Sequence, residues 1–200
     1  MRIGNRWQAS CAPISVNDQT LNWVDELKYL GIYIKSGKKF ACSWQSARSS
    51  FYKSVNCILG VLGSQPSVQV ALALVRASAL PCLTYGLSSN FLSVAEKKHF
   101  SYVYNSIFVK LFHVKDVSSI EQCQYFCNFW PFQAMYEYSR YTLLCKQLSC
   151  QVSPLYNDFD YPDSVEMLEI EVKYSFKRSD SKFALKAKVW KSLEQTLALG

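Results

Sequence analysis

Metal-ligand and disulfide signals are sparse in this 200-residue sequence. It contains only two histidines, and its eight cysteines form no Cys-x-x-Cys pair, so no zinc-finger or zinc-knuckle spacing is met. We therefore expect reduced thiols that are buried or partly buried and pack like small apolar side chains. We expect neither a bound metal ion nor a cofactor.

Long apolar runs and targeting segments are also missing. Gln69 and Arg76 interrupt the most apolar stretch, which predicts that no run reaches the roughly 18 residues that a membrane helix needs. Residues 1–11 contain two arginines but no apolar segment typical of a signal peptide. The sequence predicts an intracellular protein of the nucleus or cytoplasm, not secreted and without a membrane partner.

Acidic residues are scarce in the first part of the chain. Residues 1–115 carry 13 Lys and Arg against 4 Asp and Glu, a net charge of +9, whereas residues 116–200 carry 9 against 11, a net charge of −2. The excess of positive charge indicates either a polyanionic partner, such as nucleic acid or an acidic membrane surface, or a solvated basic face. Asp25 and Glu26 are adjacent and would point to opposite faces of a strand. The residues alone therefore predict a non-catalytic chain.

The apolar pattern predicts strands first and helices afterwards. Short strands are expected at 12–16, 21–24 and 27–34, separated by turn-forming residues. Helical periodicity starts at Ser43, a candidate N-cap, and Gly60 and Gly63 are expected to close this helix. A second helix begins after Ser67, and Pro81 should end or kink it.

Two capping-box patterns predict the next helices. Ser93 and Glu96 begin a helix that extends to about residue 113, and Ser118 and Glu121 begin a shorter one that ends near Trp130. Further helices are expected at 132–149 and 182–197. Residues 158–171 hold six acidic and no basic side chains, which predicts a flexible linker over 151–175. The fold class is mainly α: an N-terminal β-hairpin, a bundle of about five helical segments, an acidic linker and a C-terminal helix.

Several short motifs occur in an order that one protein family shares. They are "MRIGNRW", "LNWVDELKYLGIYI", "FYKSVNCILG", "LPCLTYGL", "VYNSIFVKLF" and "FWPF" before a helix with Arg140. Together they resemble the C-terminal part of the reverse transcriptase of non-long-terminal-repeat retrotransposons, of the LINE type and jockey-like. The resemblance covers roughly residues 1–150 and does not extend to 151–200.

The resemblance implies a role for "KYLG". In that family the motif lies in the primer grip, a hairpin at the end of the palm that holds the primer 3′ end. Lys28 would neutralise a phosphate, Tyr29 would lie near a sugar, and Gly31 would allow the backbone to approach closely. Packing inside the hairpin explains Tyr29 equally well, and Leu30 is expected to pack.

The resemblance also implies a thumb that follows the primer–template duplex along its backbone. Arg48, Lys53 and Lys110 would contact phosphates there. The implied organisation is an end of palm with the primer grip at 1–40, a helical thumb-like domain at 41–150, and an acidic linker with a C-terminal helix at 151–200.

The chain lacks the Tyr-x-Asp-Asp motif whose carboxylates bind two metal ions in that family. We therefore expect a truncated, inactive segment of an RNA-directed DNA polymerase that binds primer–template duplex weakly and without sequence preference. The missing palm and fingers would be a further partner. The alternative is a helical protein-interaction module derived from a decayed retroelement, which exposed Trp7, Trp23 and Tyr33 would favour.

Overall fold

The computed structural model describes residues 1–63, 67–149 and 161–198, and it is mainly helical, as predicted. The strands are β1 (Ile14–Val16), β2 (Gln19–Leu21), β3 (Glu26–Tyr29), β4 (Ile32–Lys35) and β5 (Ala41–Ser43). The helical elements are α1 (Gln45–Leu62), α2 (Val68–Leu74), η1 (Val75–Ala79), α3 (Leu80–Thr84), η2 (Leu87–Ser89), α4 (Val94–Phe112), α5 (Val117–Phe126), α6 (Phe132–Ser149), α7 (Tyr161–Tyr174) and α8 (Lys182–Ala198).

The chain divides into two compact units. The first unit comprises Met1–Pro66 and Val70–Leu83, and the second comprises Ser67–Gln69 and Thr84–Gly200. The division of the sequence at residues 40 and 150, which the polymerase resemblance implies, concerns functional segments and stays a prediction.

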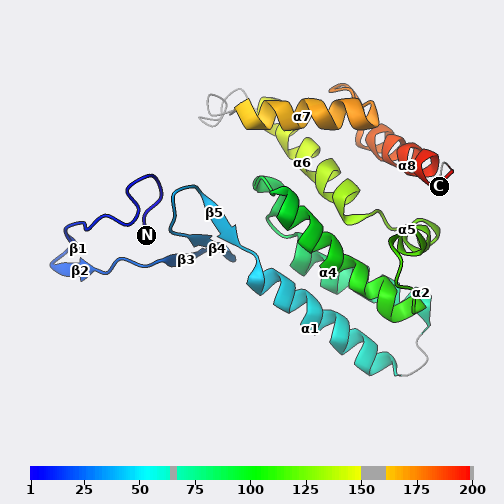
Figure 1. The fold of residues 1–200 in the computed structure, drawn as a ribbon, viewed down its shortest axis with the longest axis horizontal. Coiled ribbons are helices and arrows are strands. Elements are labelled where there is room, and N and C mark those ends of the chain that lie inside the picture. The colour runs from blue at the N-terminus through cyan, green and yellow to red at the C-terminus, as the bar shows by residue number, and fades with distance from the viewer. Residues whose placement is uncertain (64–66, 150–160, 199–200) are drawn as a thin grey trace. The chain divides into compact units, whose positions relative to one another are not determined.

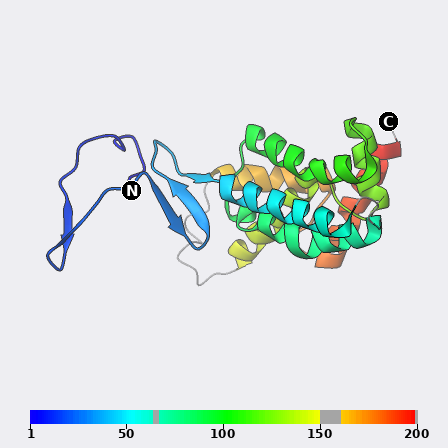
Figure 2. The same ribbon diagram turned by 90° about the horizontal axis from the view of Figure 1, so that it is seen from below.

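Two separate antiparallel sheets form the start of the first unit (Figures 1 and 2). β1 pairs with β2 across the turn at Asn17 and Asp18, which both have positive φ, and β4 lies between β3 and β5. The residues before β1 join the second sheet, because Ile3 bridges Gly37 and the Gly4 N–H donates to the Gly37 carbonyl at 2.9 Å. The predicted N-terminal hairpin region is therefore present, but two predicted strands were wrong. The strand expected at 21–24 lies earlier, as β2, and the strand expected at 27–34 is divided by the turn at Leu30 and Gly31 into β3 and β4. The sequence did not predict β5.

The start of α1 differs from the prediction. Ser43 ends β5, and the N-cap is Trp44, which makes no side-chain capping hydrogen bond. Trp44 is buried instead, as are Phe51, Val55 and Ile58 on the predicted apolar stripe. Burial of the indole therefore replaces a polar cap. At the C-terminal end of α1, one of the two glycines predicted to end the helix does so. Gly63 is the C-cap, with φ of 77°, whereas Gly60 lies inside the helix.

A π-helical turn, η1, lies between α2 and α3. Pro81 follows it as the second residue of α3. Proline cannot donate a backbone hydrogen bond, and its ring crowds the carbonyl four residues earlier. That carbonyl belongs to Ala77 in η1, where the wider π turn gives the ring space. Pro81 therefore distorts the helix without ending it.

One helical stretch among the described residues, Val68–Ser89, meets the length and composition criteria for a membrane span. The prediction that no stretch is long and apolar enough was wrong, because Arg76 and a few polar residues do not offset the many apolar ones. One third of its most apolar window is buried inside the protein. A core helix of a soluble protein meets the same criteria, so they do not identify a membrane segment.

The predicted capping box of α4 is confirmed. The Ser93 hydroxyl oxygen accepts from the Glu96 N–H, and the Glu96 carboxylate accepts from the Ser93 N–H at 2.9 Å. The second predicted box was wrong, since Asp116 is the N-cap of α5 and its carboxylate accepts from the Ser119 N–H at 2.7 Å. α5 also ends at Phe126, earlier than predicted.

α6, α7 and α8 contact one another in the second unit (Figure 1). The bounds of α6 and, within one residue, of α8 agree with the prediction. The predicted acidic linker was wrong for residues 161–174, which form α7 and bury Met167, Ile170 and Tyr174 against α6 and α8. An apolar helical spacing among the acidic residues was overlooked. Of the remaining predicted linker, residues 151–160 lie outside the described residues, and Ser175 forms a turn after α7.

The described cysteines form no disulfide among themselves, and their burial was only partly predicted. Cys42, Cys123, Cys127 and Cys145 are half-buried, whereas Cys11, Cys57 and Cys82 are exposed. Burial raises the pKa of the thiols of Cys123, Cys127 and Cys145. These three side chains are therefore protonated and weakly nucleophilic at neutral pH.

Candidate nucleic-acid-binding surface

The β3–β4 hairpin carries three of the predicted contact residues. Lys28 pairs with Tyr33 and Tyr29 pairs with Ile32, so the connection is the two-residue turn Leu30–Gly31. Both turn residues have positive φ, 46° and 84°. Left-handed conformations at both positions are typical of the tight turn that matches the twist of a hairpin. Gly31 adopts such a conformation without strain, whereas a branched, bulky residue such as Leu30 does so at a cost.

The side chains at this hairpin tip are open to solvent. Tyr29 is 60% exposed and Leu30 is 72% exposed. The prediction that Leu30 packs was wrong, as was core packing of Tyr29, because no other element covers the last strand pair and the turn at this end of the hairpin. The Lys28 ammonium lies 5.5 Å from the centre of the Tyr33 ring, a cation–π arrangement that holds the lysine on one face of the hairpin.

The other three predicted residues are not gathered at this tip. Arg48 and Lys53 lie on α1, five residues apart, which separates them by about 140° around the helix axis. They therefore do not form a stripe on one face of α1. Lys110 lies on α4 in the second unit. The structure brings together Lys28, Tyr29 and Gly31, and the roles of all six residues stay predictions.

Sequence reasoning missed a buried ionic cluster in the second unit. Arg140 and Glu166 are 4% and 5% exposed, and the Arg140 Nε donates to the Glu166 carboxylate at 2.9 Å. Arg140 also donates to the Ser88 carbonyl, and the Lys97 ammonium lies 3.7 Å from Glu166. Burial, and secondly the negative charge of Glu166, raise the pKa of the neighbouring Tyr136 hydroxyl.

A second buried carboxylate, Glu137, has its own partners. The Lys173 ammonium and the Tyr174 hydroxyl each donate to it at 2.7 Å, and the Gln133 amide donates at 2.8 Å. Burial raises the pKa of Tyr174, so this hydroxyl keeps its proton and remains a donor. Glu137 thus accepts hydrogen bonds from α7 and from its own helix, α6, while Glu166 accepts hydrogen bonds from α6. Both carboxylates also line one cavity of about 240 Å³, together with Lys97 and Lys173.

The sequence pattern does not predict these ion pairs, because their partners are far apart along the chain. Arg140 and Glu166 are 26 residues apart, and Glu137 and Lys173 are 36 residues apart. Among the described residues, no group of three potential metal ligands is gathered. In comparisons with known proteins, no family model matches the chain, and neither a curated protein nor a solved structure matches it significantly.

Proposed function

We propose that this chain binds the phosphate backbone of duplex nucleic acid, as the primer-grip and thumb segment of a non-LTR retrotransposon reverse transcriptase. The observation that supports the proposal best is the tip of the β3–β4 hairpin. There a cation, Lys28, and an aromatic side chain, Tyr29, are exposed beside a tight turn that contains Gly31.

The conformation of the tip favours a contact role over a purely structural one. At the first turn position, Asn or Gly would adopt the positive φ with less strain than leucine. Neither would expose an apolar side chain to solvent. A partner that covers Leu30 would explain why an apolar side chain occupies a strained, exposed apex. The ribose and base edges at a duplex end offer such a surface, while Lys28 can reach the adjoining phosphate.

Binding of this kind is independent of base sequence. The net charge of +9 over residues 1–115 attracts a polyanion, and lysine contacts phosphates as a point charge without reading base edges. The absence of Tyr-x-Asp-Asp from the sequence leaves the chain without the carboxylates for two-metal catalysis. The proposal is therefore binding without nucleotide incorporation.

A fluorescence anisotropy titration of a labelled primer–template duplex at several salt concentrations tests this proposal. If Lys28, Arg48, Lys53 and Lys110 neutralise three to four phosphates, log affinity should fall with log salt with a slope of roughly −3. Arg48→Ala with Lys53→Ala should flatten the slope by about 1 to 2. Lys191→Ala, at an exposed position on α8, should leave the slope unchanged.

The hairpin has its own variant in the same assay. Tyr29→Ala should weaken binding to a duplex with a recessed 3′ end more than binding to a blunt duplex, because only the former presents a primer terminus. Absence of salt-sensitive binding at low ionic strength would contradict the proposal. Primer extension by the pure protein would contradict the claim that it is inactive alone.

A second candidate function, a protein-interaction module, is favoured by apolar side chains exposed on the N-terminal strands and loops. Trp23 is 39% exposed, while Trp7 and Tyr33 are half-buried. Other exposed apolar residues in this region are Ile14, Val16, Leu21, Val24, Leu27, Leu30 and Phe40. A palm-and-fingers polypeptide supplied separately tests this candidate: hydrogen exchange over residues 12–34 should slow when the two are mixed. Unchanged exchange would count against it.

A further inference from the structure

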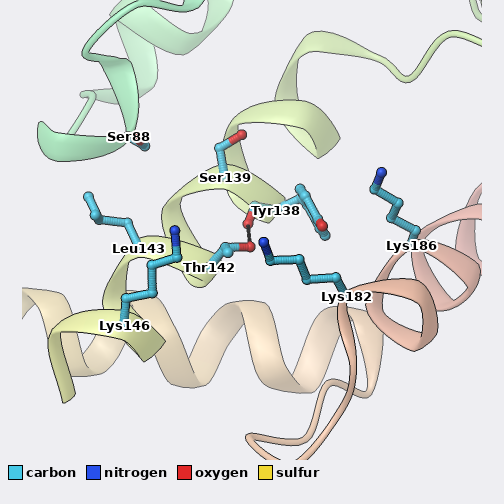
Figure 3. A pocket seen from close by; sticks show the side chains of 8 residues that line it. All are labelled: Ser88, Tyr138, Ser139, Thr142, Leu143, Lys146, Lys182 and Lys186. Atoms are coloured by element: carbon cyan, nitrogen blue, oxygen red, sulfur yellow. Dashed lines mark hydrogen bonds between the residues drawn. The ribbon is translucent and has the colours of Figure 1, made fainter. Parts of the chain in front are cut away.

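A concave site in the second unit is lined by lysines and hydroxyl groups (Figure 3). It has a cavity volume of about 390 Å³ and lies between η2, α6 and α8. Its lining residues are Ser88, Tyr138, Ser139, Thr142, Leu143, Lys146, Lys182 and Lys186. In Figure 3 the side chains of Lys146 and Lys182 extend toward Thr142 from two different helices.

The charge of this lysine pocket is uncompensated. The lining contains three lysines and no acidic residue. Within the described part of the chain, none of the three ammonium groups is within ion-pair distance of a carboxylate, whereas two other lysines of the second unit are paired. The Lys188 ammonium lies 2.6 Å from Asp180, and the Lys173 ammonium lies 2.7 Å from Glu137. The pocket therefore keeps its positive charge available for a ligand.

The arrangement of lysines on α8 is unfavourable for the helix itself. Lys182 is the first residue of α8 and Lys186 follows one turn later, so two like charges lie on one face. The first turn of α8 contains no acidic residue, and the helix dipole makes this end unfavourable for cations. Lys146 adds a third positive charge from α6. A bound anion would reduce the repulsion among the three lysines and the unfavourable interaction of Lys182 with the helix dipole.

The α6 side of the pocket also carries hydroxyl groups, and neighbouring contacts hold some of its side chains in place. The Thr142 hydroxyl donates to the Tyr138 carbonyl at 2.7 Å, which fixes its orientation. The Tyr138 ring packs edge-on against Trp130, with ring centres 5.1 Å apart. Ser139 lies exposed beside them and can donate to a ligand oxygen. Because the Thr142 proton is used in its bond to Tyr138, the donors left for a phosphate group are the ammonium groups and the Ser139 hydroxyl.

We propose that this pocket, formed by Lys146, Lys182 and Lys186 with the hydroxyls beside them, binds phosphate groups. The phosphates belong either to a free oligophosphate or to a nucleic-acid backbone, which share this chemistry. The inference rests on the second unit alone and is independent of the hairpin proposed to bind duplex. Lysine ammonium groups contact phosphates without selecting a base, so the site has no sequence preference.

Isothermal titration calorimetry with inorganic tripolyphosphate at low ionic strength tests the proposal on the full chain. The double variant Lys146→Gln with Lys182→Gln should bind at least about tenfold more weakly, because two charge-assisted contacts are lost. The matched control is Lys98→Gln with Lys191→Gln, which removes the same charge from exposed positions outside the pocket. The control should bind within about twofold of the unchanged protein. Circular dichroism establishes that both variants are folded.

The same titration identifies the source of the phosphate. Displacement of tripolyphosphate by a short DNA duplex supports a backbone ligand, and binding that the duplex does not displace supports a free oligophosphate. The proposal is overturned if the unchanged protein binds neither tripolyphosphate nor the duplex. Equal weakening in the pocket variant and the control also overturns it, since the effect would then reflect net charge. Arg48→Ala with Lys53→Ala, which tests the proposed function, should leave tripolyphosphate binding unchanged.

Discussion

The N-terminal strands and the helices of the second unit differ sharply in burial. Every residue from 8 to 31 is exposed, including both strands of the β1–β2 hairpin. In the second unit, by contrast, Phe100, Tyr104, Phe108, Tyr141 and Leu144 are at most 1% exposed. The helices thus enclose a core of their own, while the strands are held by backbone hydrogen bonds and a few contacts.

This contrast separates folding from function within one chain. An isolated two-stranded hairpin is at best marginally stable in water, because it has no apolar face to bury. The apolar residues of β1 and β2 would gain stability only against a partner. We infer that the helices supply most of the stability of the chain, whereas binding by the strands belongs to the proposed function. The predictions below test that division, beginning with the helices.

Breaking the buried ionic cluster should have the largest effect on stability. Glu166→Ala removes the carboxylate that accepts a hydrogen bond from the buried Arg140 Nε. The free energy of unfolding, measured by urea titration, should fall by about 3 to 5 kcal/mol. Glu169→Ala removes an exposed carboxylate from the same helix and should change it by less than about 0.5 kcal/mol. Equal losses of unfolding free energy in the two variants would show that burial of the carboxylate does not determine how much its removal destabilises the protein.

A matched pair of leucines tests the contrast between the two regions directly. Leu144 is fully buried in α6, and Leu21 is 52% exposed at the end of β2. Leu144→Ala should lower the free energy of unfolding by about 2 to 5 kcal/mol, because it leaves a cavity in the core. Leu21→Ala should change it by less than about 0.5 kcal/mol. A large loss from Leu21→Ala would mean that the strands have a core of their own.

Local patterns in the sequence were enough to predict much of the helical fold. The periodicity of apolar residues located α6 and α8, and the Ser93–Glu96 capping box located the start of α4. These features depend on residues three or four apart, which the sequence displays directly. The polymerase resemblance itself stays a prediction.

The errors in the prediction arise from tertiary contacts. α7 was assigned to a linker because its acidic residues suggested solvent, whereas Glu166 is neutralised by Arg140, 26 residues away. β5 was missed because its pairing with β4 makes it a strand, and three residues carry too short a pattern.

The candidate sites show the same limit. The sequence identified Lys28, Tyr29 and Gly31 together because they are adjacent along one hairpin. It offered no reason to join Lys182 with Lys146, since α6 and α8 meet only in the folded chain. Sites within one element can therefore be read from the sequence here, and sites between elements cannot.

The smallest predicted effect concerns the N-cap of α5. Hydrogen bonds from the Ser119 hydroxyl and N–H hold the pKa of the Asp116 carboxyl below its ordinary value. A lowered pKa in the folded state means that the ionised carboxylate stabilises the protein above the unfolded-state pKa. That stabilisation is lost as the pH falls through the folded-state pKa.

Asp116→Ala should therefore lower the urea midpoint slightly at pH 7, and the difference from the unchanged protein should shrink below a pH of about 3.9. Asp116→Asn keeps a side-chain acceptor and should lose the pH dependence while keeping much of the cap. Ser118→Ala should have no effect, because Asp116 and not Ser118 caps the helix. A larger effect from Ser118→Ala than from Asp116→Ala would restore the capping box that the sequence pattern predicts.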